Sequence, residues 1–184
     1  MNKKIIVLSE IVVVFIALID LLLNIKYNDF FFVLKILAIV PLLVIPRYIE
    51  KKLKMNISYL FKYIYVIYVF LSYYLGIIHK FYLTVFIFDK LVHLYFGIVL
   101  AIITEEIVYK KIIKNKKMFF ALAILVNLSI STIWEIFEFA IDKIAGSDMQ
   151  RVGTGVNDTM TDIILAFVGL LVYIVVKILN KKDK

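Results

Sequence analysis

The sequence predicts an all-α fold, a polytopic bundle of about six transmembrane helices. Hydrophobic residues make up 64% of the 184 residues, whereas about 45 to 50% is usual for a soluble domain. They are gathered into long apolar runs, most of which approach the ~20 residues that a helix needs to cross a bilayer. We therefore expect a multi-pass protein of the inner (cytoplasmic) cell membrane, with the lipid bilayer as its general partner.

Six apolar runs are the predicted spans, and they cover residues 5–23, 30–45, 57–78, 91–108, 118–141 and 163–179. The second contains Lys35 and Pro41 and stops at Pro46, which predicts a kinked or tilted helix, or one that is only partly inserted. The aromatic stretch 81–88 is too short to cross as a helix, so it is expected to lie at the interface or to re-enter the membrane. Because no repeat or linker is visible, residues 1–184 are predicted to form a single helical domain.

Lysine and arginine are concentrated at every second boundary between the predicted spans, in segments 3–4, 47–62, 110–117 and 177–184. By the positive-inside rule, this bias predicts that both termini are cytoplasmic. The formal net charge of +8 is carried mainly by these short clusters, so nucleic-acid binding is not expected. The chain has no cysteine, which excludes disulfides and thiolate metal ligands. The oligomeric state is left open.

The fifth predicted span carries a polar stripe that is unusual for a transmembrane helix. At about 100° per residue, the stripe collects the side chains of Asn127, Ser131, Glu135, Glu138 and Asp142 on one face. An ionised carboxylate near the bilayer centre costs from about 2.5 kcal/mol upward, so it normally faces a protein interior, a cavity or a bound cation. The alternative interpretation places these acids in water at the end of the helix.

Two further pairs of polar residues are predicted to meet this stripe. Asp89 and His93 lie where the fourth span begins. Asp158 and Asp162 lie before the sixth span, and each pair shares a helix face if its helix begins early enough. The predicted topology brings both pairs to the outer half of the bundle. There His93, Glu135 and Asp162 should lie at similar depth and face one another.

A histidine among carboxylates suits a divalent cation such as zinc, manganese or iron, whereas carboxylates alone suit magnesium or calcium. The candidate metal ligands are His93, Glu135, Glu138 and Asp162, with Asp89, Asp142 and Asp158 as accessory residues. No other cofactor is expected, and the catalytic residues are left open. A proton relay or a polar packing network would present the same residues, and Asp89 and Asp158 could instead be N-terminal caps.

Other polar residues are interpreted as structural. Glu105 and Glu106 are expected at a solvated helix end with local ion pairs. Asp20 is expected to pair with Lys35, and His79 is expected to face water. Trp134 is expected to pack beside the polar stripe.

The loop 146–158 leads into the last pair of acids and is rich in glycine. It either covers the acidic site or is a flexible turn, and Arg151 within it could bind an anionic group or a nearby acid. The loop does not match a phosphate-binding or dinucleotide-binding motif.

The sequence resembles the YjdF-like bacterial inner-membrane proteins at three motifs, which are Asp89-Lys90-Leu91-Val92-His93, Trp134-Glu135-Ile136-Phe137-Glu138 and Asn157-Asp158-Thr159-Met160-Thr161-Asp162-Ile163. The resemblance is close from Phe88 to Leu171 and extends to the earlier helices only in hydropathy. Where that family has a Gly-Thr-Gln-Gly-Asp type of loop, this chain departs from the pattern at residues 153–158. The resemblance implies a polytopic membrane protein with these acids and the histidine as its signature, and it implies no activity. A more distant likeness to VanZ-like proteins implies a role in the cell envelope.

Three functions fit these residues. The first is a metal-dependent membrane enzyme that acts on a lipid or on a small molecule of the cell envelope. The second is a proton- or cation-coupled transporter in which the carboxylates exchange protons or bind the cation. The third is a VanZ-like envelope accessory protein in which the acids form a structural polar core.

Overall fold

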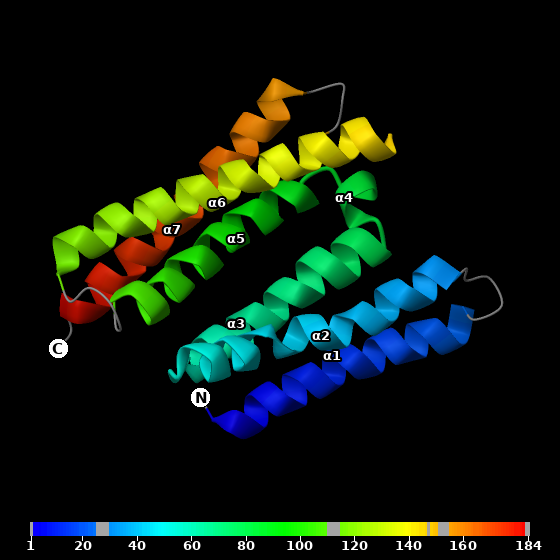
Figure 1. Cartoon of the computed structure of the whole chain (residues 1–184), viewed down its shortest axis with the longest axis horizontal. Helices are drawn as coiled ribbons and strands as arrows, with labels where there is room; N and C mark the ends of the chain where they lie inside the picture. The colour runs from blue at the N-terminus through cyan, green and yellow to red at the C-terminus, as the bar shows by residue number, and fades with distance from the viewer. Residues whose placement is uncertain (1, 25–29, 110–114, 147, 151–154, 183–184) are drawn as a thin grey trace. The chain divides into compact units, whose positions relative to one another are not determined.

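The computed structural model describes residues 2–24, 30–109, 115–146, 148–150 and 155–182, and these residues are almost entirely helical (Figure 1). In chain order the elements are α1 (Lys3–Asn24), α2 (Phe30–Leu53), α3 (Tyr59–Val69), η1 (Phe70–Ile78), α4 (Phe81–Thr84), α5 (Phe88–Thr104), η2 (Glu105–Tyr109), α6 (Lys116–Ala145) and α7 (Val156–Lys182). The η segments are π-helical continuations of α3 and α5. No strand occurs among the described residues, which confirms the predicted all-α class.

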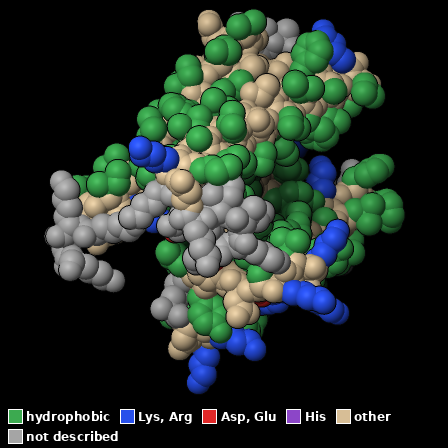
Figure 2. Space-filling model, turned by 60° about the vertical axis from the view of Figure 1, so that its left-hand side comes forward, with side chains coloured by type: hydrophobic (Ala, Val, Ile, Leu, Met, Phe, Trp, Pro, Cys, Tyr) green, Lys and Arg blue, Asp and Glu red, His purple; other side chains and the backbone are tan. Residues whose placement is uncertain are grey.

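Six helical stretches of the described residues are long and apolar enough to cross a membrane, and they cover residues 3–24, 30–53, 59–78, 88–108, 117–145 and 156–180. The predicted number of spans is therefore confirmed. Figure 2 shows many hydrophobic side chains on the surface, densest in the upper part of the view, as a lipid-facing surface requires. Helix α4 has four residues and does not span, as expected for the stretch 81–88. The cytoplasmic position of both termini stays a prediction.

The second span corrects the sequence analysis, because α2 does not stop at Pro46 but continues to Leu53 with Pro41 and Pro46 inside it. A proline has no N–H, so Pro46 leaves the carbonyl of Leu42, four residues earlier, without its usual helical donor. The hydroxyl of Tyr65 in α3 donates to that carbonyl at 3.0 Å. A neighbouring helix thus supplies the missing hydrogen bond, which is how membrane helices tolerate proline.

The described chain divides into two compact units, an amino-terminal unit (residues 1–84) and a carboxy-terminal unit (residues 85–184). The amino-terminal unit packs α1, α2, α3 and η1 around an apolar core, which consists of Val13, Ala17, Ile36, Ile39, Leu43, Val66, Val69, Tyr74 and Ile78. The prediction of a single helical domain stays a prediction.

The acids that the structure describes in the amino-terminal unit form ion pairs. Asp20 corrects the sequence analysis, because its carboxylate lies 3.1 Å from Nε2 of His79 and is not paired with Lys35. The same carboxylate accepts a hydrogen bond from the side-chain amide of Asn24 at 2.8 Å. The contact between Asp20 and His79 thereby joins α1 to the end of η1.

In the carboxy-terminal unit, α5 and α7 approach so closely that their backbones touch. A Cβ atom at Gly97 would lie 1.8 Å from the carbonyl oxygen of Ala166, and one at Gly169 would lie 2.1 Å from that of Leu94. Small residues permit this approach, as is usual at interfaces between transmembrane helices. Asn127 of α6 is fully buried and its side-chain amide donates to the carbonyls of Gly97 and Ala166. This amide ties all three long helices together.

Helix α6 has defined ends. The side chain of Asn115 accepts hydrogen bonds from the N–H groups of Lys117 and Met118, and Gly146 ends the helix in the left-handed conformation with φ of 64°. Helix α7 begins at Val156, seven residues before the predicted span, so both aspartates at its start are helical.

Candidate metal centre

Helices α5 and α7 each present a pair of polar residues one turn apart, near their N-terminal ends. Asp89 and His93 lie on the face of α5 that also carries Gly97, and Asp158 and Asp162 lie on the face of α7 that also carries Ala166. The close backbone approach therefore brings the two pairs together. All four polar side chains are buried, and Asp162 is only 1% exposed.

We call the group formed by Asp89, Lys90, His93, Glu135, Glu138, Asp158 and Asp162 the acidic centre. Within it, Asp89, His93 and Asp162 each place one ligand atom within 4.8 Å of the other two. A metal ion that lies about 2.0 to 2.4 Å from each of three ligands holds those ligands roughly 3 to 4 Å from one another. The three side chains could therefore hold a divalent ion after a small contraction. The predicted meeting of His93 with Asp162 is confirmed.

Lys90 supplies a positive charge inside the acidic centre. Its ammonium lies 2.5 Å from Oδ1 of Asp158 and 2.8 Å from both carboxylate oxygens of Asp162. It also lies 3.3 Å from Oδ2 of Asp89. A metal ion held by Asp89 and Asp162 would thus compete with the lysine for the same carboxylates.

Glu135 of α6 faces His93, as predicted. Oε1 of Glu135 lies 3.9 Å from Nδ1 of His93, and Nε2 of His93 lies 3.5 Å from Oδ1 of Asp89. Both Glu135 Oε1 and His93 Nδ1 are buried and have no hydrogen-bond partner among the described residues. Buried polar atoms nearly always have a partner, so these two atoms are available to a ligand or to a shared proton.

The other two predicted acids of α6 have different partners. Glu138 is buried, and its Oε1 accepts a hydrogen bond of 2.7 Å from the indole N–H of Trp134. Asp142 accepts hydrogen bonds from the backbone N–H groups of Met149 and Gln150, at 2.8 and 2.9 Å. Asp142 therefore shapes the start of the loop after α6, and the buried part of the predicted stripe runs from Asn127 to Glu138.

The described part of the loop 146–158 does contact the acidic centre. The side-chain amide of Gln150 donates to the carbonyl of Glu135 at 3.2 Å and to the hydroxyl of Thr159 at 3.0 Å. That amide links the end of α6 to the start of α7 beside Glu135. Arg151 and Gly153 lie outside the described residues.

Two alternatives for the acids are corrected by the structure. Asp89 is not an N-cap, because the cap of α5 is Ile87 and Asp89 is buried in the first turn. Glu105 and Glu106 are not at a solvated end. Glu106 is 5% exposed, and Glu105 contacts the Lys177 ammonium and the Tyr173 hydroxyl of α7.

The acidic centre carries an excess of negative charge. It contains five acidic side chains, all buried, and Lys90 is its one lysine. If every acid were ionised, four negative charges would remain without a compensating lysine. Such an excess is not stable in a membrane interior, so protons or bound cations must balance it.

Sequence analysis missed two residues of this site, Lys90 and Gln150. Lys90 was visible as a lysine in the first turn of a span, directly beside a buried aspartate. An isolated transmembrane lysine next to a surplus of acids is expected to pair with them, and this signal could have found it. No sequence signal identifies Gln150, because its contacts depend on how the loop folds back.

Comparison with models of known protein families gives a match. A family model described as a predicted membrane protein (DUF2238) matches residues 6–182. This match confirms the resemblance to YjdF-like proteins and extends it over the first three spans. The likeness to VanZ-like proteins is not shown. No curated protein and no solved structure matches the chain.

Proposed function

The chain belongs to the DUF2238 family of predicted membrane proteins, whose description states no activity, and from that premise we propose that its acidic centre binds a divalent metal ion. We further propose that the ion serves an enzymatic reaction on a lipid or on another small molecule of the cell envelope. One observation carries the proposal: the ligand atoms of Asp89, His93 and Asp162 converge beside the open Glu135 oxygen.

The donor set favours a transition metal over calcium or magnesium. One imidazole nitrogen with two or three carboxylate oxygens suits zinc, manganese or iron. His93 and Asp162 are the central ligands, Asp89 completes the set, and Glu135 is the fourth candidate. When bound, such an ion polarises a substrate oxygen or activates a water molecule.

The protein side chains have separate roles in this proposal. Asp158 keeps the ammonium of Lys90 when the metal takes its place at Asp89 and Asp162, since Asp158 and Lys90 are 2.5 Å apart. Glu138, held by Trp134, is the nearest further acid on α6 that could exchange a proton with Glu135. Gln150 holds the loop against α6 and α7.

Metal analysis of the detergent-purified full chain tests the binding step. After exposure to manganese or zinc and removal of excess ion, the wild type should retain about one ion per chain. His93→Ala and Asp162→Asn should each lose it. Glu106→Gln removes a buried acid of the same unit that lies outside the acidic centre, so it should keep the ion. An ion content that is unchanged in His93→Ala, or a wild type that retains none, would overturn the proposal.

A chain that fails to fold could also lose its ion, so each variant is checked for helix content and for a single peak in size-exclusion chromatography. His93→Gln keeps a polar side chain of similar length and serves as the second variant. If the acids instead form a structural polar core, variants in which an acid is neutralised should unfold, and the wild type should hold no ion.

The enzymatic step is tested with vesicles of a bacterial total lipid extract. Metal-loaded wild-type protein should convert at least one lipid species over time, as followed by mass spectrometry, while His93→Ala should not. An unchanged lipid composition with fully metal-loaded protein would count against catalysis on these lipids.

A cation or proton carrier is the second candidate, and one feature favours it. The buried polar groups of α6 continue inward from Glu135 to Ser131 and Asn127, whose Oγ and Oδ1 atoms have no hydrogen-bond partner among the described residues. This polar row runs for about 12 Å at 1.5 Å per residue. Uptake of manganese or protons by reconstituted vesicles should then depend on Glu135 and Glu138. If Glu135→Gln and Glu138→Gln both transport at the wild-type rate, the carrier is excluded.

A further inference from the structure

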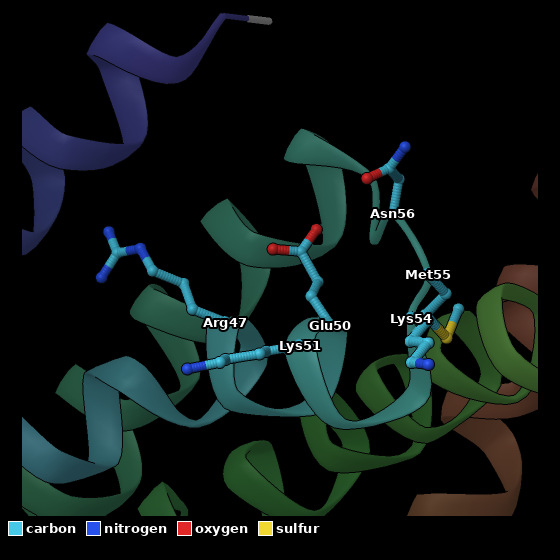
Figure 3. A pocket seen from close by; sticks show the side chains of 6 residues that line it. All are labelled: Arg47, Glu50, Lys51, Lys54, Met55 and Asn56. Atoms are coloured by element: carbon cyan, nitrogen blue, oxygen red, sulfur yellow. The ribbon is translucent and has the colours of Figure 1, made fainter.

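A basic hollow lies at one end of the amino-terminal unit, where α2 turns into α3 (Figure 3). It has a volume of about 460 Å³, and its lining residues are Arg47, Glu50, Lys51, Lys54, Met55 and Asn56. Figure 3 shows Arg47 and Lys51 extending to the same side of α2, while Lys54, Met55 and Asn56 follow along the turn. We call this the basic hollow.

The positive charge of the basic hollow exceeds its negative charge. Arg47 is paired with Glu10 of α1. Oε1 of Glu50 accepts hydrogen bonds from Lys62 at 2.7 Å and from the N–H of Ile57 at 2.8 Å. These contacts occupy both acids.

Among the described residues, neither Lys51 nor Lys54 forms an ion pair with an acid, and both side chains are exposed. Two positive charges are therefore left over at one end of a transmembrane helix pair. Together they attract anions to this end of the unit.

The hollow lies between the ends of two candidate spans, and the end of a span is where lipid head groups are expected. It is formed by the last turns of one span, which ends at Leu53, and by the turn before the next, which begins at Tyr59. Tyr59 is exposed and lies under the ammonium of Lys62 at 5.4 Å, and Tyr48 lies likewise under Lys52 at 5.9 Å. Exposed tyrosines and lysines together are typical of the membrane interface.

The backbone conformation of Lys54 is a second observation that points to a ligand site. Lys54 has φ of 49°, in the left-handed region that favours glycine at the end of a helix. The N–H of Met55 donates to the carbonyl of Glu50 at 3.1 Å and closes this turn. A lysine at such a position is strained, and strained residues gather at ligand sites. Here the side chain of the strained residue lines the basic hollow.

We propose that the basic hollow binds the phosphate group of an anionic ligand, with Lys51 and Lys54 as its charge partners. Asn56, which also lines the hollow, offers an amide donor. The phosphate belongs either to the head group of an anionic lipid or to a soluble phosphate compound, since both present the same chemistry to two lysines. This site is separate from the acidic centre and does not depend on its metal.

Native mass spectrometry of the detergent-purified full chain tests the proposal with two lipid probes. Phosphatidylglycerol and phosphatidylcholine are added at equal concentration, and the retained adducts are compared. The wild type should retain phosphatidylglycerol in preference. The double variant Lys51→Gln, Lys54→Gly should lose that preference by roughly tenfold or more, because each lysine near an anionic head group contributes substantially to binding.

The design separates loss of binding from loss of folding. Glycine relieves the left-handed backbone at position 54, so the double variant should melt at a temperature no lower than the wild type. The matched control is Lys3→Gln, Lys4→Gln, which removes two exposed lysines from the same unit and should keep the lipid preference. An equal loss in this control would show unspecific attraction and overturn the site.

Calorimetric titration with inorganic phosphate distinguishes the two sources. Phosphate binding that requires Lys51 and Lys54, without a lipid preference that requires them, identifies a soluble ligand. A lipid preference without phosphate binding identifies a head group. If neither the lipid preference nor phosphate binding changes in the double variant, the basic hollow is not an anion site.

Discussion

The two units of the chain use charged residues in different ways. In the amino-terminal unit, each acid that the structure describes has a basic partner: Glu10 with Arg47, Asp20 with His79 and Glu50 with Lys62. The interior of that unit is apolar. In the carboxy-terminal unit, five acids are buried around the single ammonium of Lys90.

The difference separates structural charges from charges that call for a ligand. An ion pair at a helix end leaves neither charge uncompensated, and it contributes little to stability. A buried excess of acidic side chains must be balanced by protons or cations that come from outside the protein. Four predictions, in order of decreasing effect, test this comparison.

Replacing Lys90 should have the largest effect. Lys90→Met leaves three aspartates without their cation, and removing one partner of a buried charge pair costs about 3 to 5 kcal/mol. Thermal unfolding in detergent measures the loss, and added manganese or zinc should restore much of it, because the ion can take the place of the ammonium at Asp89 and Asp162. Lys62→Met, at the paired helix end, should cost less and gain nothing from the ion. Equal losses of thermal stability in the two variants would show that the two units do not differ in how much their charged residues contribute.

Separating α5 from α7 should have the next largest effect. A Cβ at Gly97 meets the Ala166 backbone at 1.8 Å, so Gly97→Ala should destabilise the carboxy-terminal unit by about 2 to 3 kcal/mol. It should also weaken metal retention, since this contact brings the two ligand pairs together.

Gly76→Ala is the matched control for that variant. There the added Cβ meets the ring of Tyr82, a side chain that can move aside. Chemical denaturation of both variants gives the comparison. A Gly97→Ala protein as stable and as metal-loaded as Gly76→Ala would contradict the close packing.

Removing the hydroxyl that donates to the Leu42 carbonyl should have a smaller effect. Tyr65→Phe leaves the Leu42 carbonyl without its donor, which should cost about 1 kcal/mol in thermal unfolding. Tyr63→Phe, on the same helix, serves as the control. Indistinguishable melting curves for the two variants would mean that the Tyr65 hydrogen bond does not support α2 at Pro46.

Breaking the exposed ion pair of Arg47 and Glu10 should have the smallest effect on stability. Arg47 is 42% exposed in its pair with Glu10, so Arg47→Gln should change stability by about 0 to 1 kcal/mol, and less at high salt. Metal content should be unchanged. A loss as large as that of Lys90→Met would show that surface pairs in this chain are not minor.

The sequence by itself determined the all-α class, the number of spans and the residues of the polar stripe. Long apolar runs can satisfy their backbone only as helices in lipid, and helical spacing then places Asn127, Ser131 and Glu135 on one face. The similar depth of His93 and Glu135, which lie 3.9 Å apart, followed from span positions and helical rise. These inferences hold because they depend on properties that each helix has alone.

Only the tertiary structure decided which acids share a centre and what balances them. Asp89 joins His93 and Asp162 because Gly97 and Gly169 let two backbones touch, whereas Asp142 turns to the loop after its own helix. The continuation of α2 through Pro46 likewise depends on a hydroxyl from another helix. The position of Lys90 between α5 and α7 also arises from the packing. Such contacts are set by distances between helices, and a pattern along one chain does not contain those distances.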